Sequence, residues 1–444
     1  MKLPQWANSV VLAGRRLLQR DPYTAKKKVN SEEDLLNLCR ELLSTKGEAV
    51  GITLAAAVEE AYQQLIEDEK IAFFKHLFEH FSIDTEKVSK AIDEFQSSQE
   101  SGAVYRLHKA TEASRLELFR RINMAPKGTK TLVEMREDLL PLLKENEQLK
   151  DIDLDLTHLM RSWFNRGFLK LVEINWQTPA HILEKLMEYE AVHSMNGWED
   201  LRRRLAADRR CYAFFHPAMQ DEPIIFVQVA LSCGLSSSIQ ELLETPEREE
   251  LDNSTDTAIF YSISDCQKGL KGISLGNFLI KQVVMEIRKE APQINQFATL
   301  SPIPGFRNWL RKKLEEEEPN NGLTELIKFP LVKGPISQAI YSDEQKTKVL
   351  KLCAEYLYLV KKNEEPIDPV ARFHLRNGAS IRRLNWNGDT SFKGVEQSLG
   401  IMVNYHYDLT RVEERHEAFV NQKKVSIDKE FSKQISDTEI QSST

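Results

Sequence analysis

The sequence predicts an α+β fold, in which an N-terminal all-helical domain is followed by a mixed α/β catalytic domain. Apolar residues recur at helical spacing through residues 1–165, whereas alternation with period two begins near Leu171. A chain of 444 residues, 41% of them hydrophobic, is long enough for two or three domains. We therefore expect a helical domain at 1–165, a catalytic domain at 166–425 and a polar, flexible tail at 426–444.

The helical domain is expected from a series of amphipathic segments. Ser31-Glu32-Glu33-Asp34 is typical of a capped helix start. The segments 71–81 and 116–119 each place apolar side chains on one helical face. Pro141, within the leucine-rich run 139–143, marks either a kink or the first turn of a helix. These apolar helix faces predict the core of a helical bundle. Apolar side chains beyond those that the core needs favour a subunit interface.

Strands and helices are expected to alternate in the catalytic domain, since the period of the apolar residues changes from segment to segment. The runs 211–215 and 224–231 flank a turn-rich segment and predict a hairpin. The other expected elements are strands at 171–176, 258–264, 297–300 and 402–407, a helix at 180–190, a helix with Phe278, Leu279, Val283, Val284 and Ile287 on one face, and a helix that carries Trp309 and Leu310.

Composition and charge limit the partners of the chain. A net charge of −7 and a pI near 5.9 argue against a general nucleic-acid-binding protein. No apolar run approaches the ~20 residues that span a bilayer, so we expect no membrane partner. Five scattered cysteines without a CxxC pair predict free thiols in a reducing compartment and no zinc site.

The two ends of the chain bear on its compartment. Residues 1–28 contain a short apolar run followed by three arginines, which fits either the first helix of a cytosolic protein or an organelle presequence. The last residues, 441–444, lack a Ser-Lys-Leu peroxisomal signal. We expect a cytoplasmic protein, with the mitochondrial matrix as the alternative.

A glycine-rich segment follows the 258–264 strand and precedes the next helix. It reads Gln267-Lys268-Gly269-Leu270-Lys271-Gly272-Ile273-Ser274-Leu275-Gly276. Glycines let backbone N–H groups approach an anion, and a helix N-terminus adds unpaired N–H groups and a positive dipole end. With the charges of Lys268 and Lys271, the segment suits a pyrophosphate. The alternative is a plain turn, because the segment is neither a P-loop nor a dinucleotide-binding fingerprint.

Longer strings resemble known families. The order strand, glycine loop, helix, strand resembles the CoA-binding core of the N-acetyltransferase superfold, in which two strands splay apart around the pantetheine arm. Over about residues 160–410 the chain also resembles malonyl-CoA decarboxylase, with the family's strings in the same order and at similar gaps. These strings are Ala258 to Ser264, Gly269 to Gly272, Leu300-Ser301-Pro302-Ile303-Pro304-Gly305-Phe306, Asp368 to Ala379 with its Phe373-His374-Leu375 centre, and Asn404-Tyr405-His406-Tyr407.

The resemblance implies roles for individual residues. Ser301 and His374 match the family's catalytic pair, and Ser262 and Tyr407 match polar positions around the malonyl group. The residues that match or flank the CoA-contacting loop are Lys268, Gly269, Lys271, Gly272, Ile273, Ser274, Leu275, Gly276 and Asn277. Ser274 departs from the family, because animal members have a glutamate there. A carboxylate at this position is therefore not essential here, unless another acid replaces it.

The implied reaction converts malonyl-CoA to acetyl-CoA and CO2. Loss of CO2 leaves negative charge on the thioester oxygen as an enolate, which fixed donors stabilise before the α-carbon is protonated. Because the thioester is itself the electron sink, we expect no cofactor and no metal. With an unperturbed pKa of ~6.5, His374 suits the proton donor. Ser301 would hydrogen-bond the leaving carboxylate or relay the proton.

Other assignments stay open at the level of single residues. Alone, Ser301 is a loop serine before a proline, and His374 is a hydrogen-bonded structural histidine. An acyl-CoA-dependent N-acyltransferase would use the same fold with an amine acceptor. A scaffold that merely binds acyl-CoA would show no turnover. The apolar surplus of the helical domain and the resemblance favour a homo-oligomer, either a tetramer or a dimer.

Overall fold

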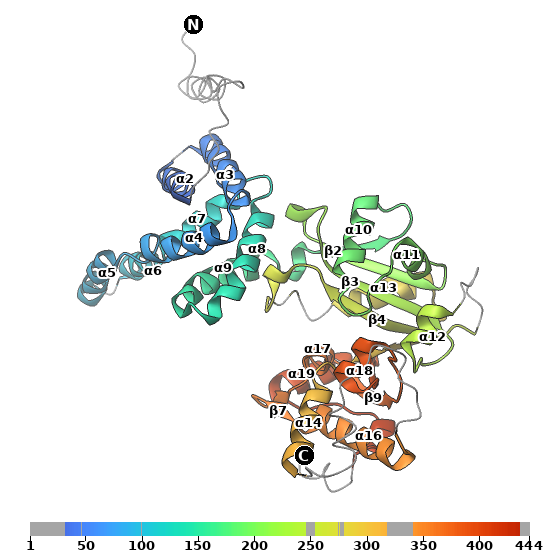
Figure 1. Ribbon diagram of the computed structural model, residues 1–444. Helices are drawn as coiled ribbons and strands as arrows, with labels where there is room; N and C mark the ends of the chain where they lie inside the picture. Colours follow the sequence, from blue (N-terminus) through green and yellow to red (C-terminus); the bar gives the residue numbers. More distant parts are fainter. Residues whose placement is uncertain are drawn as a thin grey trace. The chain divides into compact units, whose positions relative to one another are not determined.

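The chain forms two compact units in the computed structural model, which describes residues 32–435 except 46, 99, 246–253, 274, 276–278 and 318–340 (Figure 1). The first, which we call the helical unit, comprises Met1–Leu169, His216–Gln220 and Gln267–Ser274. The second, the sheet unit, comprises Lys170–Phe215, Asp221–Cys266 and Leu275–Thr444. The helical unit thus includes two short segments from the later part of the chain, which the sequence did not indicate.

The helical unit is a set of amphipathic helices that bury aromatic and aliphatic side chains, as the sequence predicted. Tyr62, Phe73, Phe74 and Phe119 are almost fully buried in it. Pro141 lies in the first turn of a short 3-10 helix, η1, one of the two expected outcomes. The helices are α2 (Glu32–Ser44), α3 (Glu48–Gln63), α4 (Glu67–His80), α5 (Thr85–Ser98), α6 (Ser101–Ala110), α7 (Ser114–Ile122), α8 (Gly128–Leu139), η1 (Leu140–Lys144), η2 (Glu147–Leu149), α9 (Lys150–Trp163), η3 (Arg166–Phe168), η4 (Pro217–Met219) and η5 (Lys268–Leu270).

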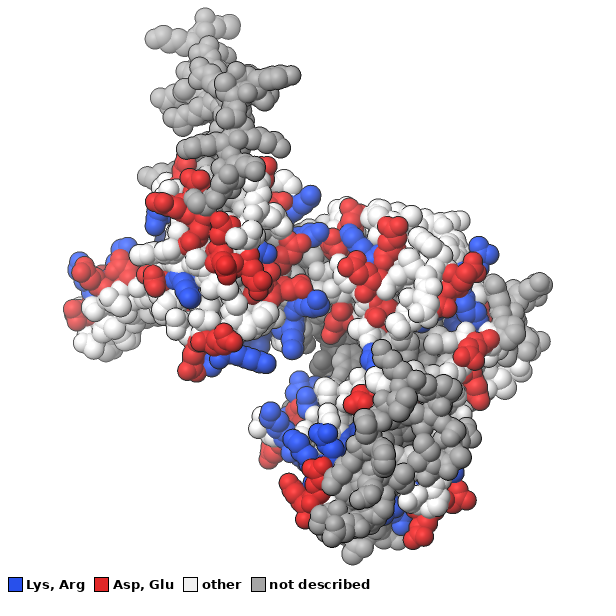
Figure 2. Space-filling view, viewed as in Figure 1, with Lys and Arg blue, Asp and Glu red and all other residues white. Residues whose placement is uncertain are grey.

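Charges of both signs share the visible surface of the helical unit. Acidic side chains are spread over its face, with basic side chains between them (Figure 2). Two arginines are instead buried with acidic partners: Arg115 pairs with Asp155 at 2.6 Å and Arg136 pairs with Asp153 at 2.7 Å. No helix among the described residues has the length and apolar content that crossing a bilayer requires.

The sheet unit is built on an eight-stranded mixed sheet in the order β1-β2-β3-β4-β5-β10-β6, with β9 paired to β10. Neighbours from β1 to β4 are antiparallel, β4 and β5 are parallel, and β10 runs antiparallel to β5, β6 and β9. The strands are β1 (Lys170–Ile174), β2 (Arg209–Phe215), β3 (Pro223–Ser232), β4 (Thr257–Asp265), β5 (Gln296–Thr299), β6 (Ser301–Pro302), β9 (Ser380–Asn385) and β10 (Met402–His406). A separate pair joins β7 (Lys361–Lys362) and β8 (Glu365–Pro366).

Helices cover this sheet and connect its strands. The parallel step from β4 to β5 needs a crossover, which includes α13. The helices are α10 (Ala180–Tyr189), α11 (Trp198–Arg204), α12 (Ile239–Glu244), α13 (Leu279–Glu290), α14 (Phe306–Glu317), α16 (Asp343–Tyr358), α17 (Pro369–Arg376), α18 (Phe392–Ser398), α19 (Val412–Gln422) and α20 (Lys429–Ser432). The α+β fold, the hairpin and the order strand, loop, helix, strand from β4 to β5 agree with the sequence-based expectations. The segment from α16 to β9 was not assigned from sequence.

Residues 426–435 differ from the expected flexible tail, because they pack on the sheet unit. Ile427 forms a β-bridge with Ile381. The Asp428 carboxylate accepts hydrogen bonds from the Ser380 hydroxyl at 2.7 Å and from Arg382 at 3.2 Å. Phe431 is fully buried, so an apolar anchor adds to these polar contacts. The polar composition of the segment concealed these side chains. Residues 436–444 lie outside the described part of the chain.

Candidate active site

Ser301 is placed by a strand that separates from β4 but keeps its pairing with β10. The pairing of β5 with β4 ends at Phe260 and Thr299, after which the Leu300 N–H donates to the Phe260 carbonyl at 3.0 Å. Ser301 then pairs with Val403 of β10. Downstream, the position of Gly305 admits no side chain, because a Cβ there would lie 2.4 Å from the Tyr356 hydroxyl. The Leu-Ser-Pro-Ile-Pro-Gly string therefore holds Ser301 at a fixed point between β5 and α14.

His374 is placed by a short helix with defined ends. The Asp368 side chain caps α17 by accepting the Ala371 N–H at 2.8 Å, and Pro369 occupies the first turn. Gly378 follows the helix with φ of +80°, where a Cβ would lie 2.1 Å from the Val412 carbonyl oxygen. Between these ends His374 points inward and is only 3% exposed. The string from Asp368 to Ala379 thus contains a capped helix that carries one buried histidine.

Ser301 and His374 meet in the folded chain, and Tyr407 joins them. The Ser301 hydroxyl lies 3.1 Å from His374 Nε2, and the Tyr407 hydroxyl lies 2.8 Å from His374 Nδ1. Ser301 also donates to the Thr299 hydroxyl at 2.8 Å, and the same oxygen accepts the Tyr405 N–H at 3.1 Å. Both ring nitrogens of His374 are therefore engaged by hydroxyl groups, in a site whose members are all buried.

Burial controls the charge of this cluster. It lowers the pKa of His374 from 6.5 to about 3 and raises the pKa of Tyr407 well above its usual range. The imidazole also stacks on the Tyr405 ring, with centroids 4.5 Å apart. Near neutral pH the cluster is therefore uncharged, which corrects the expectation that His374 keeps its ordinary pKa. A neutral imidazole still carries one N–H donor and one acceptor nitrogen.

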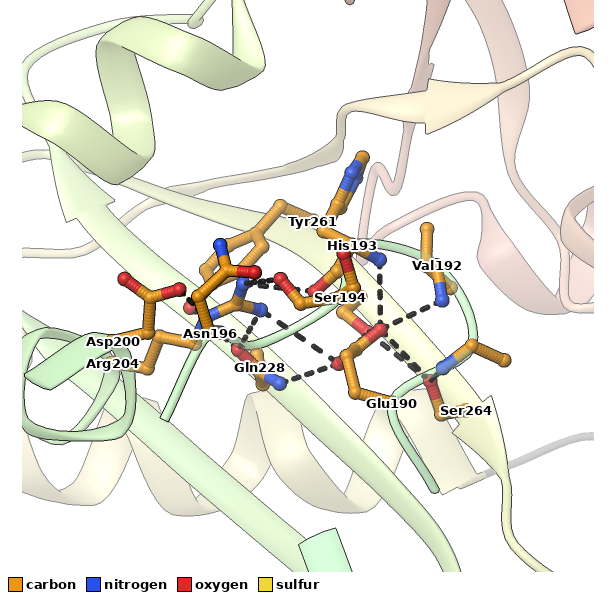
Figure 3. A network of polar contacts seen from close by, with 12 residues as sticks. Glu190, Val192, His193, Ser194, Asn196, Asp200, Arg204, Gln228, Tyr261 and Ser264 are labelled. Atoms are coloured by element: carbon orange, nitrogen blue, oxygen red, sulfur yellow. Dashed lines mark hydrogen bonds and ion pairs between the residues drawn. The ribbon is translucent and has the colours of Figure 1, made fainter. Parts of the chain in front are cut away.

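Ser262 is held by a different cluster, which the sequence gave no reason to expect. Its hydroxyl donates to both oxygens of the Glu190 carboxylate, at 2.9 and 2.8 Å. The Glu190 side chain is fully buried after α10, and Figure 3 shows hydrogen bonds converging on it from neighbouring elements. Glu190 escaped sequence reasoning because a glutamate at a helix end is most often exposed. The four expected site residues outside the glycine loop are thus divided between two buried polar clusters, with Ser301, His374 and Tyr407 in one and Ser262 in the other.

Residues 267–273 of the glycine loop belong to the helical unit. The buried Arg136 guanidinium donates to the Gly269 carbonyl at 2.6 Å and to the Lys271 carbonyl at 2.9 Å. Gly269 must be glycine, because a Cβ would lie 1.9 Å from the Val133 carbonyl oxygen. Lys268 is exposed and pairs with Glu137 at 3.4 Å. The loop is therefore held firmly by α8, through an arginine that sequence reasoning missed.

Gly272 differs from Gly269 in its surroundings. Its φ is +77°, a conformation that favours glycine, and nothing lies within 4 Å of the position a Cβ would take. Ile273 is buried, and Leu275, which lies in the sheet unit, is half-buried. Ser274, Gly276 and Asn277 lie outside the described residues. The described part of the loop thus presents an open backbone surface at Gly272, next to the exposed Lys271.

A group of possible metal-binding side chains lies in the part of the chain that the structure describes. His76, Glu79 and His80 of α4 place possible ligand atoms within 4.8 Å of one another, on the surface of the helical unit. His76 also contacts Glu32. This group was not expected from sequence, and the hydroxyl–imidazole cluster of the sheet unit does not include it.

Comparison with protein families assigns both parts of the chain. A model described as the malonyl-CoA decarboxylase C-terminal domain matches residues 167–444, and one described as the malonyl-CoA decarboxylase N-terminal domain matches residues 81–164. A solved malonyl-CoA decarboxylase from Rhodopseudomonas palustris is 46% identical, with a TM-score of 0.84 over 91% of this chain and 99% of that chain. One from Agrobacterium vitis is 42% identical, with a TM-score of 0.81 over 90% and 99%.

Curated proteins with the same description match a shorter stretch. "Malonyl-CoA decarboxylase, mitochondrial" of Anser anser anser is 38% identical over 336 residues, which are 69% of this chain and 66% of that protein. The Mus musculus protein of that name is 39% identical over 319 residues, covering 66% and 65%. The chain therefore spans just under two thirds of the length of these relatives.

The buried imidazole leads to a prediction about pH. Because the folded pKa of His374 is about 3 and its ordinary pKa is 6.5, the native state binds fewer protons than the unfolded state between these values. Stability that is present above pH 6.5 is therefore lost as the pH falls through this window. We expect the His374 ring resonances, assigned by comparison with His374→Gln, to stay in the neutral form down to about pH 4. A native-state titration near pH 6.5 would contradict the burial of this ring.

Proposed function

Because the chain belongs to the malonyl-CoA decarboxylase family, we propose that it removes CO2 from malonyl-CoA and releases acetyl-CoA. The observation that carries this proposal is the buried Ser301–His374–Tyr407 cluster, in which both members of the implied catalytic pair are in hydrogen-bond contact. The N-acyltransferase and scaffold alternatives have less support, because the relatives named above are decarboxylases.

In the proposed reaction, the bond between the α-carbon and the carboxylate breaks, and its electron pair moves onto the thioester oxygen. Donors fixed in a dry site stabilise that oxygen, and burial disfavours the charged carboxylate relative to neutral CO2. The thioester accepts the electron pair, so the step needs no further electron sink. Ser301, 5% exposed, and His374 supply hydroxyl and imidazole groups for these tasks.

The proton for the α-carbon comes from the hydroxyl–imidazole pair. In the resting site the Tyr407 hydroxyl donates to Nδ1 of His374, which leaves the ring proton on Nε2, and the raised pKa of Tyr407 keeps this phenol protonated. Ser301 gives its hydroxyl proton to the carbanion and takes the Nε2 proton of His374, with which it is in contact at 3.1 Å. Nδ1 takes the Tyr407 hydroxyl proton in the same step, so the imidazole stays neutral and the negative charge rests on the Tyr407 oxygen. After release of acetyl-CoA, Tyr407 takes up one proton from solvent.

CoA recognition is assigned to the glycine loop. Gly272 presents an open backbone position on the helical unit, with Lys268 and Lys271 as exposed cations, whereas the N–H groups of Lys271 and Ile273 donate to carbonyls within the loop. Both features suit phosphate oxygens. Ser262 contacts the Glu190 carboxylate and is not assigned to the malonyl group.

The compartment and the assembly of the chain are also proposals. All five cysteines are free thiols, which suits a reducing compartment, either the cytoplasm or the mitochondrial matrix. The helical unit exposes large apolar side chains, among which Ile66, Tyr105 and Leu154 are 65%, 66% and 65% exposed. Apolar side chains exposed to this extent favour a subunit interface, and we propose a homo-oligomer, either a tetramer or a dimer.

Activity is tested by replacing the two catalytic residues. We expect Ser301→Ala and His374→Ala each to lower kcat by about 10²–10⁴-fold with little change in KM, because both act on charge that appears in the transition state. Ser398→Ala is the matched control: this serine is also buried, but its hydroxyl bonds only the backbone oxygens of Gly394 and Ile401.

The assay is CO2 and acetyl-CoA release from malonyl-CoA by protein treated with EDTA, with no amine acceptor added. If the two residues form one proton path, the double variant should be little worse than the worse single variant. If both alanine variants fold and keep a near-normal kcat, the assignment of the active site to Ser301 and His374 is wrong. Loss of activity with EDTA that a metal ion restores would contradict the metal-free mechanism.

Substrate binding is tested at Gly272. We expect Gly272→Val to raise the Kd for CoA, because the residue would strain a backbone with φ of +77° and its branched side chain would cover the open N–H surface. The measurement is calorimetric titration with CoA. Gly234→Val, a second glycine with positive φ (+70°) and open surroundings, is the matched control in the sheet unit. Unchanged CoA affinity in folded Gly272→Val would refute the assignment of the loop.

Assembly is tested by placing a charge on the helical unit. We expect the wild-type chain to have the mass of a dimer or tetramer in light scattering, and Ile66→Asp, Tyr105→Asp or Leu154→Asp to lower that mass where the residue lies in the interface. An aspartate buried in an apolar interface is strongly unfavourable, whereas on a free surface it is tolerated. A wild-type monomer at assay concentrations would contradict the oligomer proposal.

A further inference from the structure

The buried polar cluster around Glu190 lies where β4 leaves β5. Four residue pairs join these strands, the last being Phe260 with Thr299. Beyond that point β6 pairs with β10, whereas the rest of β4 pairs with β3 as far as Asp265. The two strands therefore diverge after Phe260, and Ser262 is the second residue of β4 beyond the divergence.

A β-bulge marks the same point. The register between β3 and β4 shifts between Gln228 and Val229, which are opposite Ser262 and Phe260, so Tyr261 is the extra residue of β4. A bulge bends its strand and increases the local twist. The extra residue has no partner in the regular strand pairing, so its side chain must be held by another contact. Here the Tyr261 hydroxyl donates to the Gln228 side-chain oxygen at 2.8 Å.

Glu190 ties the bent part of β4 to its surroundings. One carboxylate oxygen accepts the backbone N–H groups of Val192 and His193 at 2.7 and 2.9 Å, and the other accepts the Gln228 amide at 2.6 Å. Ser262 donates to both oxygens, and Ser264 lies 3.3 Å from one of them. Figure 3 shows these bonds meeting at one carboxylate. The two serines are side chains of β4, and Gln228 belongs to β3.

A buried charge pair accompanies these hydrogen bonds. Arg204, itself 3% exposed, lies 3.8 Å from Glu190 and donates to Gln228 and to the His193 carbonyl. Burial lowers the pKa of the neighbouring His193 to about 4, so this ring stays neutral. A fully buried ion pair is weak evidence for stability, since apolar packing of the same volume is often equally stable. Its role is better explained by the geometry that it specifies.

We propose that Glu190 is a positioning residue that keeps β4 apart from β5 beyond Phe260, so that the arm of the CoA substrate can enter between them. This inference rests on the proposed function and deepens it. Without the carboxylate, the hydroxyls of Ser262 and Ser264 lose their shared acceptor, and the bent end of β4 is free to relax. Among the described residues Glu190 bonds Ser262, Ser264 and Gln228 rather than Ser301 or His374, so its loss acts on binding of the arm rather than on chemistry.

The test is Glu190→Gln, with the Kd for CoA measured by calorimetry and with kcat and KM measured for malonyl-CoA. The glutamine would set its amide N–H against N–H donors that now face a carboxylate oxygen. We expect the Kd and KM to rise together by about tenfold, with kcat changed far less, as when binding that is equal in the ground state and the transition state is lost. If Glu190 had a structural role alone, Glu190→Gln would lower the stability of the fold without raising KM relative to the change in kcat.

Asp208→Asn is the matched control. Asp208 is also a buried acid of the sheet unit that pairs with arginines, Arg203 at 2.7 Å and Arg209 at 2.8 Å. It lies at the other end of β3, since its carbonyl accepts the Leu231 N–H and Leu231 pairs with Ala258, where β4 and β5 are still joined. We expect Asp208→Asn to lose stability and to keep its affinity for CoA.

The outcomes separate this inference from the proposed function. A wild-type chain that neither binds CoA nor consumes malonyl-CoA refutes the proposed function. A wild type that does both, with unchanged Kd in folded Glu190→Gln, overturns the role of Glu190. An equal rise in Kd for Glu190→Gln and Asp208→Asn also overturns it, since the effect is then general. If Glu190→Gln does not fold, Ser262→Ala replaces it: a raised Kd supports the proposal, and an unchanged Kd overturns it.

Discussion

The antiparallel pairing of β10 with both β5 and β6 is the constraint on which the site depends. One register continues across the break, since His406 pairs with Ala298, Val403 with Ser301 and Met402 with Pro302. Asn404 secures this point by donating its amide to the Thr299 carbonyl at 2.6 Å. Because Ser301 and Tyr407 are fixed along the same strand pair, one imidazole can contact both hydroxyls.

The imidazole of His374 is carried by a helix and not by a strand of the sheet. This explains why α17 is short and has well-defined ends. A helix of eight residues has little stability of its own, so its direction depends on its two ends. Asp368 fixes the start and Gly378 the end, and the ring of His374 lies against Tyr405 between them. The same burial that orients the ring also removes its charge. Position and protonation state are thus set by one feature, close packing around the histidine.

Sequence reasoning identified the fold class, the strand–loop–helix–strand order and the Ser301–His374 pair, because each has a local pattern. Alternation predicted β1, and a short string of unusual residues surrounds each catalytic side chain. The roles of Glu190 and Arg136 had no such pattern, since burial of a glutamate or an arginine depends on partners distant in sequence, such as Ser262 and Gly269. The pKa of His374 likewise depends on atoms that only the folded chain brings near it.

The composition of the helical unit has a consequence for the order of events during synthesis. Arg136 is buried and donates to the carbonyls of Gly269 and Lys271, which are made more than a hundred residues later. Until residues 267–273 have been translated, the unit lacks the loop whose carbonyls accept from Arg136. The nascent helices therefore hold Arg136 with its Asp153 partner but without these two carbonyls while β1 to β4 are translated. The helical unit is thus completed only after much of the sheet unit has been made, and a chain cut at residue 170 would leave the helical unit without its two later segments.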